Sequence, residues 1–351
     1  MGTGRIEDGA APSPLSARSD PTGGRAVTQT RYGGPEVLRL TRRPRPHPGE
    51  GQVLVNVQAA SVNARDWHVM RGEPRVARLM DRTLFAARRP RIATRGTDLA
   101  GVVESVGDGV TTWKPGDTVF GEGIGAFADY AVASADQLAV MPAGTSFQEA
   151  AALPLAATTA LLCLDETSLE PGGSILINGA SGGVGTFAVQ AAKARGLHVT
   201  AVVSTRNIGL VRSLGTDAVI DYTATDFTRT GRTYDAVVDL VGNRRLRDLR
   251  RSVRSGGTLV LSGGGIPGNG RLVGPLRLLI GATAVARFQP FEVKVPQAVP
   301  NSPTLARVAD LVGSGSLRPL IDRTFPLMDA AAAVRYVETE HPRGKVVLTI
   351  G

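Results

Sequence analysis

The chain has a single cysteine, Cys163, among its 351 residues. One thiol excludes an intrachain disulfide and any cysteine-rich zinc lobe, and its rarity is typical of a reducing, intracellular compartment, so we expect a cytoplasmic protein. Long apolar runs are missing as well. The longest candidate, residues 150–164, is rich in alanine and interrupted by Pro154, so we expect no membrane span.

Lysine is scarce, because only four of the 40 basic residues are lysines, although the formal net charge is +9. The arginines gather in two clusters, residues 71–95 and 244–254. No nucleic-acid-binding motif or run of stacking aromatics accompanies them, so we expect no nucleic-acid partner. A basic surface would still attract an anionic cofactor or substrate.

The pattern of apolar residues changes near position 150. Residues 25–150 contain short alternating runs and many turns, which predicts a β-rich region. In residues 151–291 short apolar runs alternate with helical stretches, which is typical of a doubly wound parallel sheet. Residues 1–24 are rich in glycine, alanine, serine and proline and are expected to form a disordered extension. Beyond 291 we expect two helices and a last strand, over residues 302–319, 328–341 and 344–350.

The segment ILINGASGGVGTFAVQAAKARG reads as a strand, a glycine-rich turn and a helix. Gly179, Gly182 and Gly185 are spaced by three residues, which lets the backbone approach a pyrophosphate at the N-terminus of a helix. Three further strand–helix units supply the context that such a motif needs. We therefore expect a dinucleotide here, held also by Ser181, Gly183 and Val184, and the alternative is a plain tight turn.

The end of the next strand predicts which dinucleotide binds. An NAD site usually has an acidic residue there for the ribose 2′-hydroxyl, whereas this chain has Ser204, Thr205 and Arg206. Hydroxyls and a guanidinium suit a 2′-phosphate, because arginine offers a planar fork of donors and a permanent charge. We expect NADPH, with NADH as a weaker cofactor. The alternative is a surface arginine that begins a helix.

Eight motifs occur in an order that is more specific than any one of them: RYGGPEVLRL, AASVNARDWHVMRGE, GTDLAGVVESVGDGV, GDTVFG, AALPLAATTAL, GASGGVG, RSLGTDAVIDY and GKVVL. Over residues 25–351 the chain resembles the medium-chain dehydrogenase/reductase superfamily, in its zinc-independent quinone oxidoreductase (zeta-crystallin-like) branch. The resemblance implies an α/β fold. A GroES-like β-rich catalytic domain over 25–150, completed by 292–351, would carry a Rossmann NADP-binding domain over 151–291.

The chain departs from the zinc-dependent members of that superfamily at the metal ligands. Asn63 stands where those enzymes have a catalytic cysteine, and Gly96-Thr97-Asp98 stands where they have Gly-His-Glu. Their four-cysteine structural lobe is missing. Because a tetrahedral zinc needs several Cys or His ligands, we expect no metal.

Without a Lewis acid, a simple ketone is hard to polarise, whereas a quinone or a conjugated carbonyl is already electrophilic. The resemblance implies that Asn63 lies near the nicotinamide, where its amide can donate to a developing oxyanion. His68 is a candidate proton donor, and the alternative is a structural histidine with solvent as the proton source. We interpret Asp66 as a structural anchor rather than a base.

The resemblance also implies further cofactor contacts. Thr159 would lie beside the nicotinamide and Tyr222 at the 2′-phosphate end, while Lys345 would reach the cofactor phosphates. Val241, Gly242, Ser262 and Gly263 end the fourth and fifth strands and would line the nicotinamide side. Core packing is the alternative for Thr159 and Val241. Residues 288–297 resemble the edge strand through which such proteins form homodimers, and the alternative is an edge protected by Lys294 and Pro296.

These expectations lead to a zinc-independent NADPH-dependent reductase of a quinone or an α,β-unsaturated carbonyl. Two other readings stay open. One is a metal-free NAD(P)-dependent alcohol dehydrogenase for small alcohols and aldehydes, which the missing ligands oppose. The other is a non-catalytic, crystallin-like NADPH-binding protein, for which the arginine clusters are the only support in the sequence.

Overall fold

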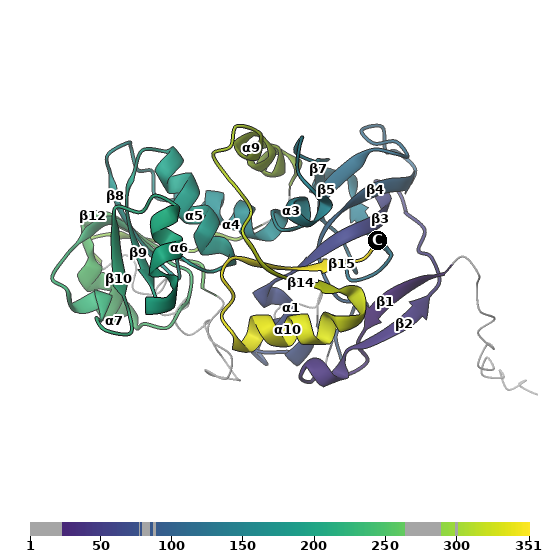
Figure 1. Cartoon of the computed structure of the whole chain (residues 1–351), viewed down its shortest axis with the longest axis horizontal. Helices are drawn as coiled ribbons and strands as arrows, with labels where there is room; N and C mark the ends of the chain where they lie inside the picture. Colours follow the sequence, from purple (N-terminus) through teal and green to yellow (C-terminus); the bar gives the residue numbers. More distant parts are fainter. Residues whose placement is uncertain (1–22, 77, 79–84, 87–88, 264–288, 299–300) are drawn as a thin grey trace, which may run out of the picture.

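The computed structural model describes residues 23–76, 78, 85–86, 89–263, 289–298 and 301–351. Most of the expected extension over residues 1–24 lies outside this part, and strand β1 begins at Gly24. The strands form two large sheets and one hairpin. Figure 1 shows the two large sheets toward opposite ends of the long axis of the molecule, with helices between them.

The six-stranded sheet is entirely parallel. Its strands lie in the order β10 (Ala218–Asp221), β9 (His198–Val203), β8 (Ser174–Asn178), β11 (Tyr234–Asp239), β12 (Val253–Leu261) and β13 (Glu292–Lys294). In chain order this is third, second, first, fourth, fifth and sixth, the order of a Rossmann sheet. The α-helices between its strands, within the described residues, are α5 (Gly183–Ala194), α6 (Ile208–Ser213) and α7 (Leu246–Leu249). The doubly wound sheet expected from the sequence is confirmed.

Strand β8 shows why these strands are apolar throughout. Ile175 and Ile177 are fully buried in the core on one face of the sheet. Leu176, between them, is fully buried on the other face, with Phe227 and Leu249. Because both faces of a parallel sheet are covered, neither set of alternating positions meets water. An apolar run without alternation is the result.

The seven-stranded sheet is assembled from both ends of the chain. Its path runs β14 (Ile321–Pro326), β15 (Lys345–Thr349), β3 (Gln52–Val62), β4 (Asp98–Val106), β5 (Thr118–Glu122) and β7 (Leu138–Val140), and β6 (Tyr130–Ser134) also pairs with β3. Strand β15 is antiparallel to β3. The last strand of the chain therefore completes a sheet that begins almost 300 residues earlier, as the GroES-like pattern implied.

Four strands were not singled out from the sequence: β7, β14 and the two strands of the hairpin, β1 (Gly24–Thr28) and β2 (Arg39–Arg43). The hairpin strands read GRAVT and RLTRR, and β14 reads IDRTFP. Most side chains of β2 and β14 are exposed or half-buried. Without one buried face, β2 and β14 lack the alternation that marks a strand, and β7 is only three residues long.

Helices α3 (Phe147–Ala151) and α4 (Pro154–Asp165) join the two large sheets. One hydrophobic core includes Phe120 of the seven-stranded sheet, Ile177 of the six-stranded sheet and Leu161 of α4. The longest apolar run is thus a buried linking helix. Burial raises the pKa of the Cys163 thiol in α4 to about 11, so this cysteine is protonated and inert at neutral pH.

The remaining helices are α1 (Ala64–Arg71), α9 (Ser302–Gly313) and α10 (Ala330–Thr339). Helix α10 lies beside α1, and an ion pair joins Glu338 of α10 to Arg71 of α1. Across the described segments, no helix combines the length and the apolar character needed to cross a bilayer. The cytoplasmic location stays a prediction.

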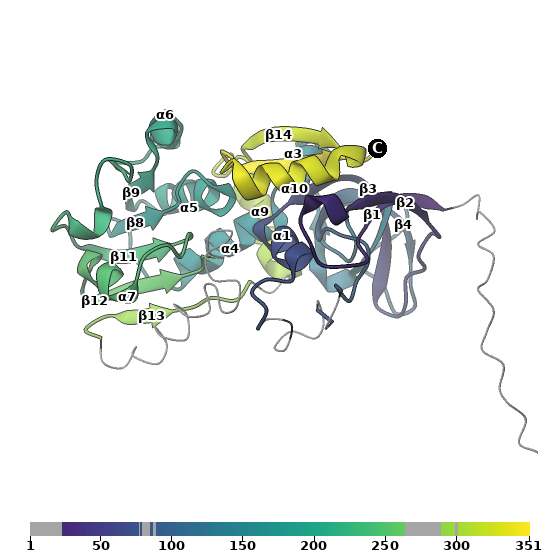
Figure 2. The same cartoon turned by 90° about the horizontal axis from the view of Figure 1, so that it is seen from below.

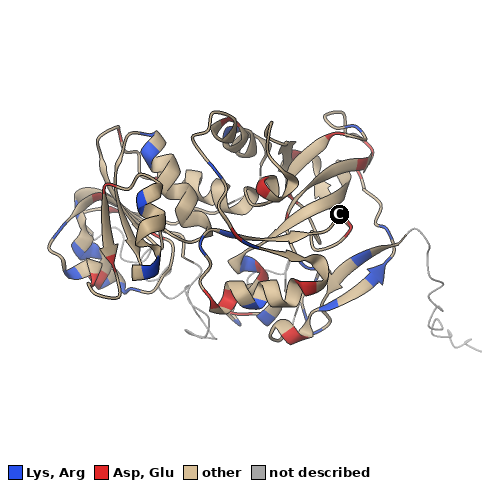
Figure 3. Ribbon diagram, viewed as in Figure 1, with Lys and Arg blue, Asp and Glu red and all other residues tan. Residues whose placement is uncertain are grey.

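Basic residues are spread over both halves of the molecule rather than gathered on one element (Figure 3). In the cluster over residues 244–254, four arginines have acidic neighbours. The ion pairs are Arg244–Asp226, Arg247–Asp248, Arg251–Asp248 and Arg254–Asp235. Pairing of this kind is typical of a solvated surface, and the absence of a nucleic-acid partner stays a prediction.

Candidate functional site

The glycine-rich turn joins β8 to α5. Gly179 has a φ of +86°, which suits glycine, and a Cβ there would lie 2.7 Å from Val241 Cγ2. Gly182 is the N-cap of α5 and provides no side chain to cap it. The first N–H groups of α5 are therefore left for a ligand, as in other anion sites at helix N-termini.

Gly185 is the position where the turn tolerates no side chain. A Cβ there would overlap the Gly179 carbonyl oxygen and would lie 2.7 Å from Ala180 Cα. We expect Gly185→Ala to lower the free energy of unfolding by about 1–3 kcal/mol and to weaken NADPH binding, because backbone must move away from the helix. Urea unfolding and a cofactor titration measure the two effects.

Gly209→Ala is the matched control, since Gly209 also lies in a helix, α6, and a Cβ there would meet no atom within 4 Å. It should leave NADPH binding unchanged and stabilise the helix by up to about 1 kcal/mol. Equal behaviour of the two variants would contradict the tight packing assigned to Gly185.

The structure brings the candidate residues of the parallel sheet to one edge. They follow the carboxyl ends of successive strands, which in such sheets all face the ligand crevice. The turns after β11 and β12 approach each other closely, since a Cβ at Gly263 would lie 2.5 Å from the Gly242 backbone nitrogen. The residues concerned are Gly179, Ser181, Gly182, Gly183, Val184 and Gly185 after β8, Ser204, Thr205 and Arg206 after β9, Tyr222 after β10, Val241 and Gly242 after β11, and Ser262 and Gly263 after β12.

A buried carboxylate that the sequence reading missed holds the turn after β11. Asp239 is fully buried, and its Oδ1 accepts hydrogen bonds from Asn178 Nδ2 (2.9 Å), Val241 N (3.1 Å) and Gly242 N (3.0 Å). The sequence contained one signal for this contact: each of the two apolar strands, SILIN and YDAVVD, ends in a polar residue, Asn178 and Asp239. Asp239 thereby fixes two residues expected on the nicotinamide side.

Thr159 lies in α4 and is half-buried. Its hydroxyl donates to the Leu155 carbonyl oxygen at 2.6 Å, one turn earlier in the same helix. That bond leaves the oxygen available as an acceptor. A contact with the nicotinamide stays a prediction for this residue.

Arg206 is exposed and is anchored to the segment that follows α10. Its Nη2 donates to the carbonyl oxygens of Glu340 (2.6 Å) and His341 (2.8 Å). A second guanidinium lies beside it, because Arg343 Nη2 donates to the Arg206 carbonyl oxygen at 3.3 Å. Arg343 was missed in the sequence because it belongs to the far end of the chain, two residues before Lys345. Two arginines are thus gathered where one was expected.

The other candidates at this end are differently placed. The Thr205 hydroxyl donates to Asp221 Oδ2 at 2.6 Å, so it is engaged with a carboxylate rather than directed only at a ligand. Hydrogen bonds from Thr205 and Thr223 hold the pKa of Asp221 below its usual range, which keeps this carboxylate charged. Tyr222 is 47% exposed and its ring is available to a ligand.

Asn63 forms the N-cap of α1 and is 6% exposed. Its Oδ1 accepts a hydrogen bond from Lys345 Nζ. An ammonium can only donate, so the amide oxygen must face Lys345 and the NH₂ group must face away. Asn63 Nδ2 is buried and has no hydrogen-bond partner in the described part of the chain. The result is an unused donor of fixed orientation.

Lys345, the first residue of β15, links this donor to the glycine turn. A Cβ at Gly183 would lie 3.1 Å from Lys345 Cδ, and Gly344 N donates to the Ser181 carbonyl oxygen at 3.0 Å. The stem of Lys345 therefore lies against the turn that was expected to hold phosphates. Its ammonium, however, is directed to Asn63 and to Asp98, whose Oδ2 is 3.8 Å away.

Asp66 and His68 both belong to α1. Asp66 Oδ2 accepts from the Asn63 backbone N–H at 2.7 Å, which is the anchoring role expected for it. Burial raises the pKa of Asp66 to about 6. His68 Nδ1 lies 3.0 Å from the Glu73 carbonyl oxygen, and its ring stacks on Trp67 at 3.7 Å. These contacts lie toward the C-terminal end of α1, and the proton-donor role stays a prediction.

The positions that correspond to zinc ligands are engaged in other ways. Asn63 is bound by Lys345, and Arg65 Nη2 donates to Thr97 Oγ1 at 2.7 Å. Asp98 Oδ2 accepts from Ser61 Oγ at 3.0 Å. Among the described residues, no three His, Cys, Asp or Glu side chains are grouped as a metal site would require.

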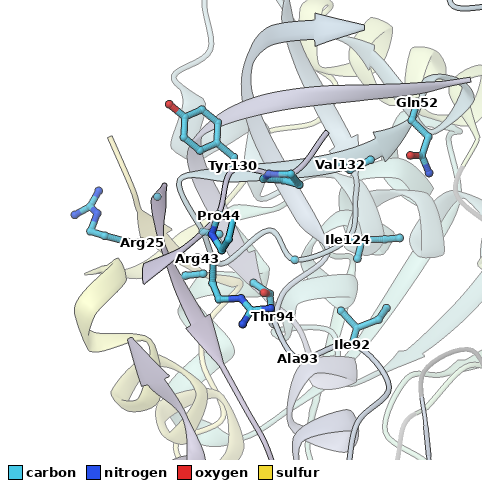
Figure 4. A pocket seen from close by; sticks show the side chains of 15 residues that line it. Arg25, Arg43, Pro44, Gln52, Ile92, Ala93, Thr94, Ile124, Tyr130 and Val132 are labelled. Carbon is cyan, nitrogen blue, oxygen red and sulfur yellow. The ribbon is translucent and has the colours of Figure 1, made fainter. Parts of the chain in front are cut away.

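A separate cavity of about 430 Å³ opens beside the β1–β2 hairpin (Figure 4). Arg43, Ile92, Thr94 and Ile124 are among the residues that line it. None of the candidate site residues is among them, so it is distinct from the edge described above. Two segments were expected to cover the cleft: of residues 264–290 only 289–290 are described, whereas residues 71–95 are described except for 77, 79–84 and 87–88.

Two family models match the chain. One, described as an alcohol dehydrogenase GroES-like domain, matches residues 49–143. The other, described as a zinc-binding dehydrogenase, matches residues 214–348. The second description contrasts with the donor set of this chain, in which Asn63 and Thr97 stand at ligand positions.

The chain is similar to proteins of known name over nearly its whole length. It is 32% identical over 339 residues to quinone-oxidoreductase QR1, chloroplastic, of Triphysaria versicolor, covering 92% of this chain and 98% of that protein. It is 33% identical over 332 residues to NADPH-dependent alkenal/one oxidoreductase, chloroplastic, of Arabidopsis thaliana, covering 90% and 77%. The structure of the quinone oxidoreductase from Coxiella burnetii has a TM-score of 0.82 at 30% identity, covering 94% and 100%.

Proposed function

Because the chain belongs to the medium-chain dehydrogenase/reductase family, among its quinone oxidoreductases, we propose that it reduces a quinone or an α,β-unsaturated carbonyl with NADPH. It is an oxidoreductase with a nicotinamide cofactor. The observation that carries the choice of substrate is the buried Nδ2 of Asn63, close to the glycine turn, which has no hydrogen-bond partner among the residues that the structure describes.

The residues present fit the cofactor. The uncapped N-terminus of α5, with its closely packed glycines, suits a pyrophosphate. Arg206 and Arg343, with Ser204 and Tyr222, would receive the 2′-phosphate. The turns after β11 and β12, with Thr159, would receive the nicotinamide, which supplies a hydride when bound.

The chain's own contribution is to orient the substrate and to stabilise charge. Addition of a hydride to the β-carbon of an enone moves an electron pair onto the carbonyl oxygen and produces an enolate, and a quinone similarly gives a hydroquinone anion. Asn63 Nδ2 would donate to this oxyanion without first breaking another hydrogen bond among the described residues. A proton from water or from His68 then completes the reduction.

The experiment that tests this function is NADPH oxidation with a panel of quinones, enals and enones, with simple ketones as controls. We expect turnover of conjugated substrates and little of the simple ketones. Equal rates with simple ketones, or oxidation of small alcohols with NADP⁺, would favour an alcohol dehydrogenase. Tight NADPH binding without turnover of any of these compounds would favour a non-catalytic binding protein.

We expect the activity to be independent of metal. Asn63 and Thr97 supply no thiolate or imidazole, and both are already hydrogen-bonded to basic side chains. Dialysis against a chelator should leave turnover unchanged, and elemental analysis should find no stoichiometric zinc. Loss of activity on dialysis, with recovery on adding zinc, would contradict this.

We also propose a homodimer formed through β13. This strand is the outermost of the six-stranded sheet (Figure 2), and an unpaired sheet edge is readily buried by a second copy. Light scattering should give twice the chain mass of 36.6 kDa. A monomer mass at micromolar concentration would favour the alternative, an edge protected by Lys294 and Pro296.

A further inference from the structure

The start of β15 is the place where the two functional parts of the molecule meet. Val346 pairs with Val62 in the antiparallel ladder between β15 and β3, so the preceding residue, Lys345, reaches Asn63. On the other side, Gly344 forms a parallel bridge with Gly182 of the glycine turn. One residue step therefore separates the contact with the cofactor turn from the contact with Asn63.

The Lys345 ammonium is buried, with 3% of the residue exposed. The charged groups that face it are Asp98 of β4, Asp66 and Arg65 of α1, and Glu122 of β5. Burial lowers the pKa of Lys345, while the three carboxylates raise it. A lysine is almost never fully buried unless it is paired, because removing its charge from water is costly. The only hydrogen bond that its Nζ makes within the described residues goes to Asn63 Oδ1.

We propose that Lys345 is a positioning residue for the reduction: it holds the Asn63 amide with Nδ2 directed into the cleft and couples that orientation to the glycine turn. The proposal rests on the role proposed above for Asn63. Without the ammonium, the amide can turn by half a rotation and present Oδ1, an acceptor that repels an oxyanion. Asp98 acts as the counter-ion that keeps Lys345 charged, and it is itself held by Ser61 Oγ at 3.0 Å and Leu155 N at 3.3 Å.

The test is a double-mutant cycle with Lys345→Met, Asn63→Ala and the combined variant. We expect Lys345→Met to lower kcat by about tenfold or more and to leave the NADPH dissociation constant nearly unchanged. The combined variant should be no slower than Asn63→Ala, because Lys345 acts through the amide. Effects on kcat that multiply would overturn the proposal. So would a large loss of NADPH affinity at unchanged kcat, which would assign Lys345 to the cofactor phosphates.

The pH profile separates this role from a merely structural one. A neutral amine can accept as well as donate, so kcat should fall as pH rises through the pKa of Lys345. Asp98→Asn removes the counter-ion and should move that fall to lower pH, whereas Asn63→Ala should abolish it. An alkaline limb that stays in place in Asp98→Asn would contradict the proposal.

Stability measurements keep the test independent of turnover. If Lys345→Met folds poorly because Asp98 is left unpaired, Lys345→Met/Asp98→Asn removes both charges and takes its place. Urea unfolding of the same cycle should show coupling between Asn63 and Lys345 of about fivefold or more in the folding equilibrium. If the parent reduces no substrate but urea unfolding shows coupling between Asn63 and Lys345, the proposed function is refuted and the Lys345–Asn63 link stands. Absence of coupling would refute the link.

Discussion

Asn63→Ala is expected to lower kcat with the best conjugated substrate by on the order of 100-fold, while NADPH binds nearly as before. Loss of one donor to an oxyanion typically has an effect of this size because the donor is already oriented and shielded from water. Asn63 meets both conditions, since Lys345 fixes its amide and the residue is 6% exposed. Steady-state kinetics and a separate cofactor titration measure the two quantities.

Asn56→Ala is a suitable control for this variant. Asn56 lies on the same strand, β3, and is half-buried, and its Oδ1 accepts from Gln58 Nε2 at 2.8 Å. We expect its turnover to match that of the parent. A parent-like rate for Asn63→Ala would show that backbone groups or substrate solvation stabilise the oxyanion without this amide.

Arg206→Glu is expected to remove a preference for NADPH over NADH of roughly ten- to a hundredfold. A charge-assisted hydrogen bond to phosphate contributes about 1.5–3 kcal/mol, and exposure of Arg206 moves the expected value toward the lower end of that range. At about 1.4 kcal/mol per factor of ten, this gives the stated range. The glutamate would repel the 2′-phosphate and offer the NADH ribose an acceptor. Dissociation constants of both cofactors at low and high salt measure the change.

Arg212→Glu makes the same change of charge in the neighbouring helix α6 and controls for general attraction of anions. It should alter the salt dependence without altering the ratio of the two affinities. Arg343 beside Arg206 adds positive charge, whereas the Asp221 carboxylate opposes a phosphate. A parent that binds NADH as tightly as NADPH would show that Asp221 prevails.

The two halves of the site differ in how far neighbouring residues in the sequence specify them. For the cofactor half, the predictions rested on local patterns: the apolar strands, the glycine spacing and the Ser204–Arg206 segment all lie next to the elements that they describe. Parallel strands place their carboxyl ends at one edge, so residues that follow different strands are predictably brought together. The structure places these residues after the carboxyl ends of the parallel strands, and their contacts with a cofactor stay a prediction.

For the reactive half, local patterns named residues without naming their partners. Asn63, Asp66 and Asp98 were noticed in the sequence, but nothing near them indicated that Lys345 would bind the amide. The same holds for Arg343, which approaches Arg206 from the opposite end of the chain.

The sequence by itself determined the Rossmann sheet, the glycine turn and the family, because each is written in residues close together along the chain. The tertiary structure alone decided which atom of the Asn63 amide binds Lys345 and which has no partner within the described segments. That outcome depends on antiparallel pairing between β3 and β15, which brings residues 282 positions apart into one hydrogen bond. A ladder of this kind is specified by backbone groups and buried side chains along its whole length. No single residue in it therefore predicts which residue lies opposite on the neighbouring strand.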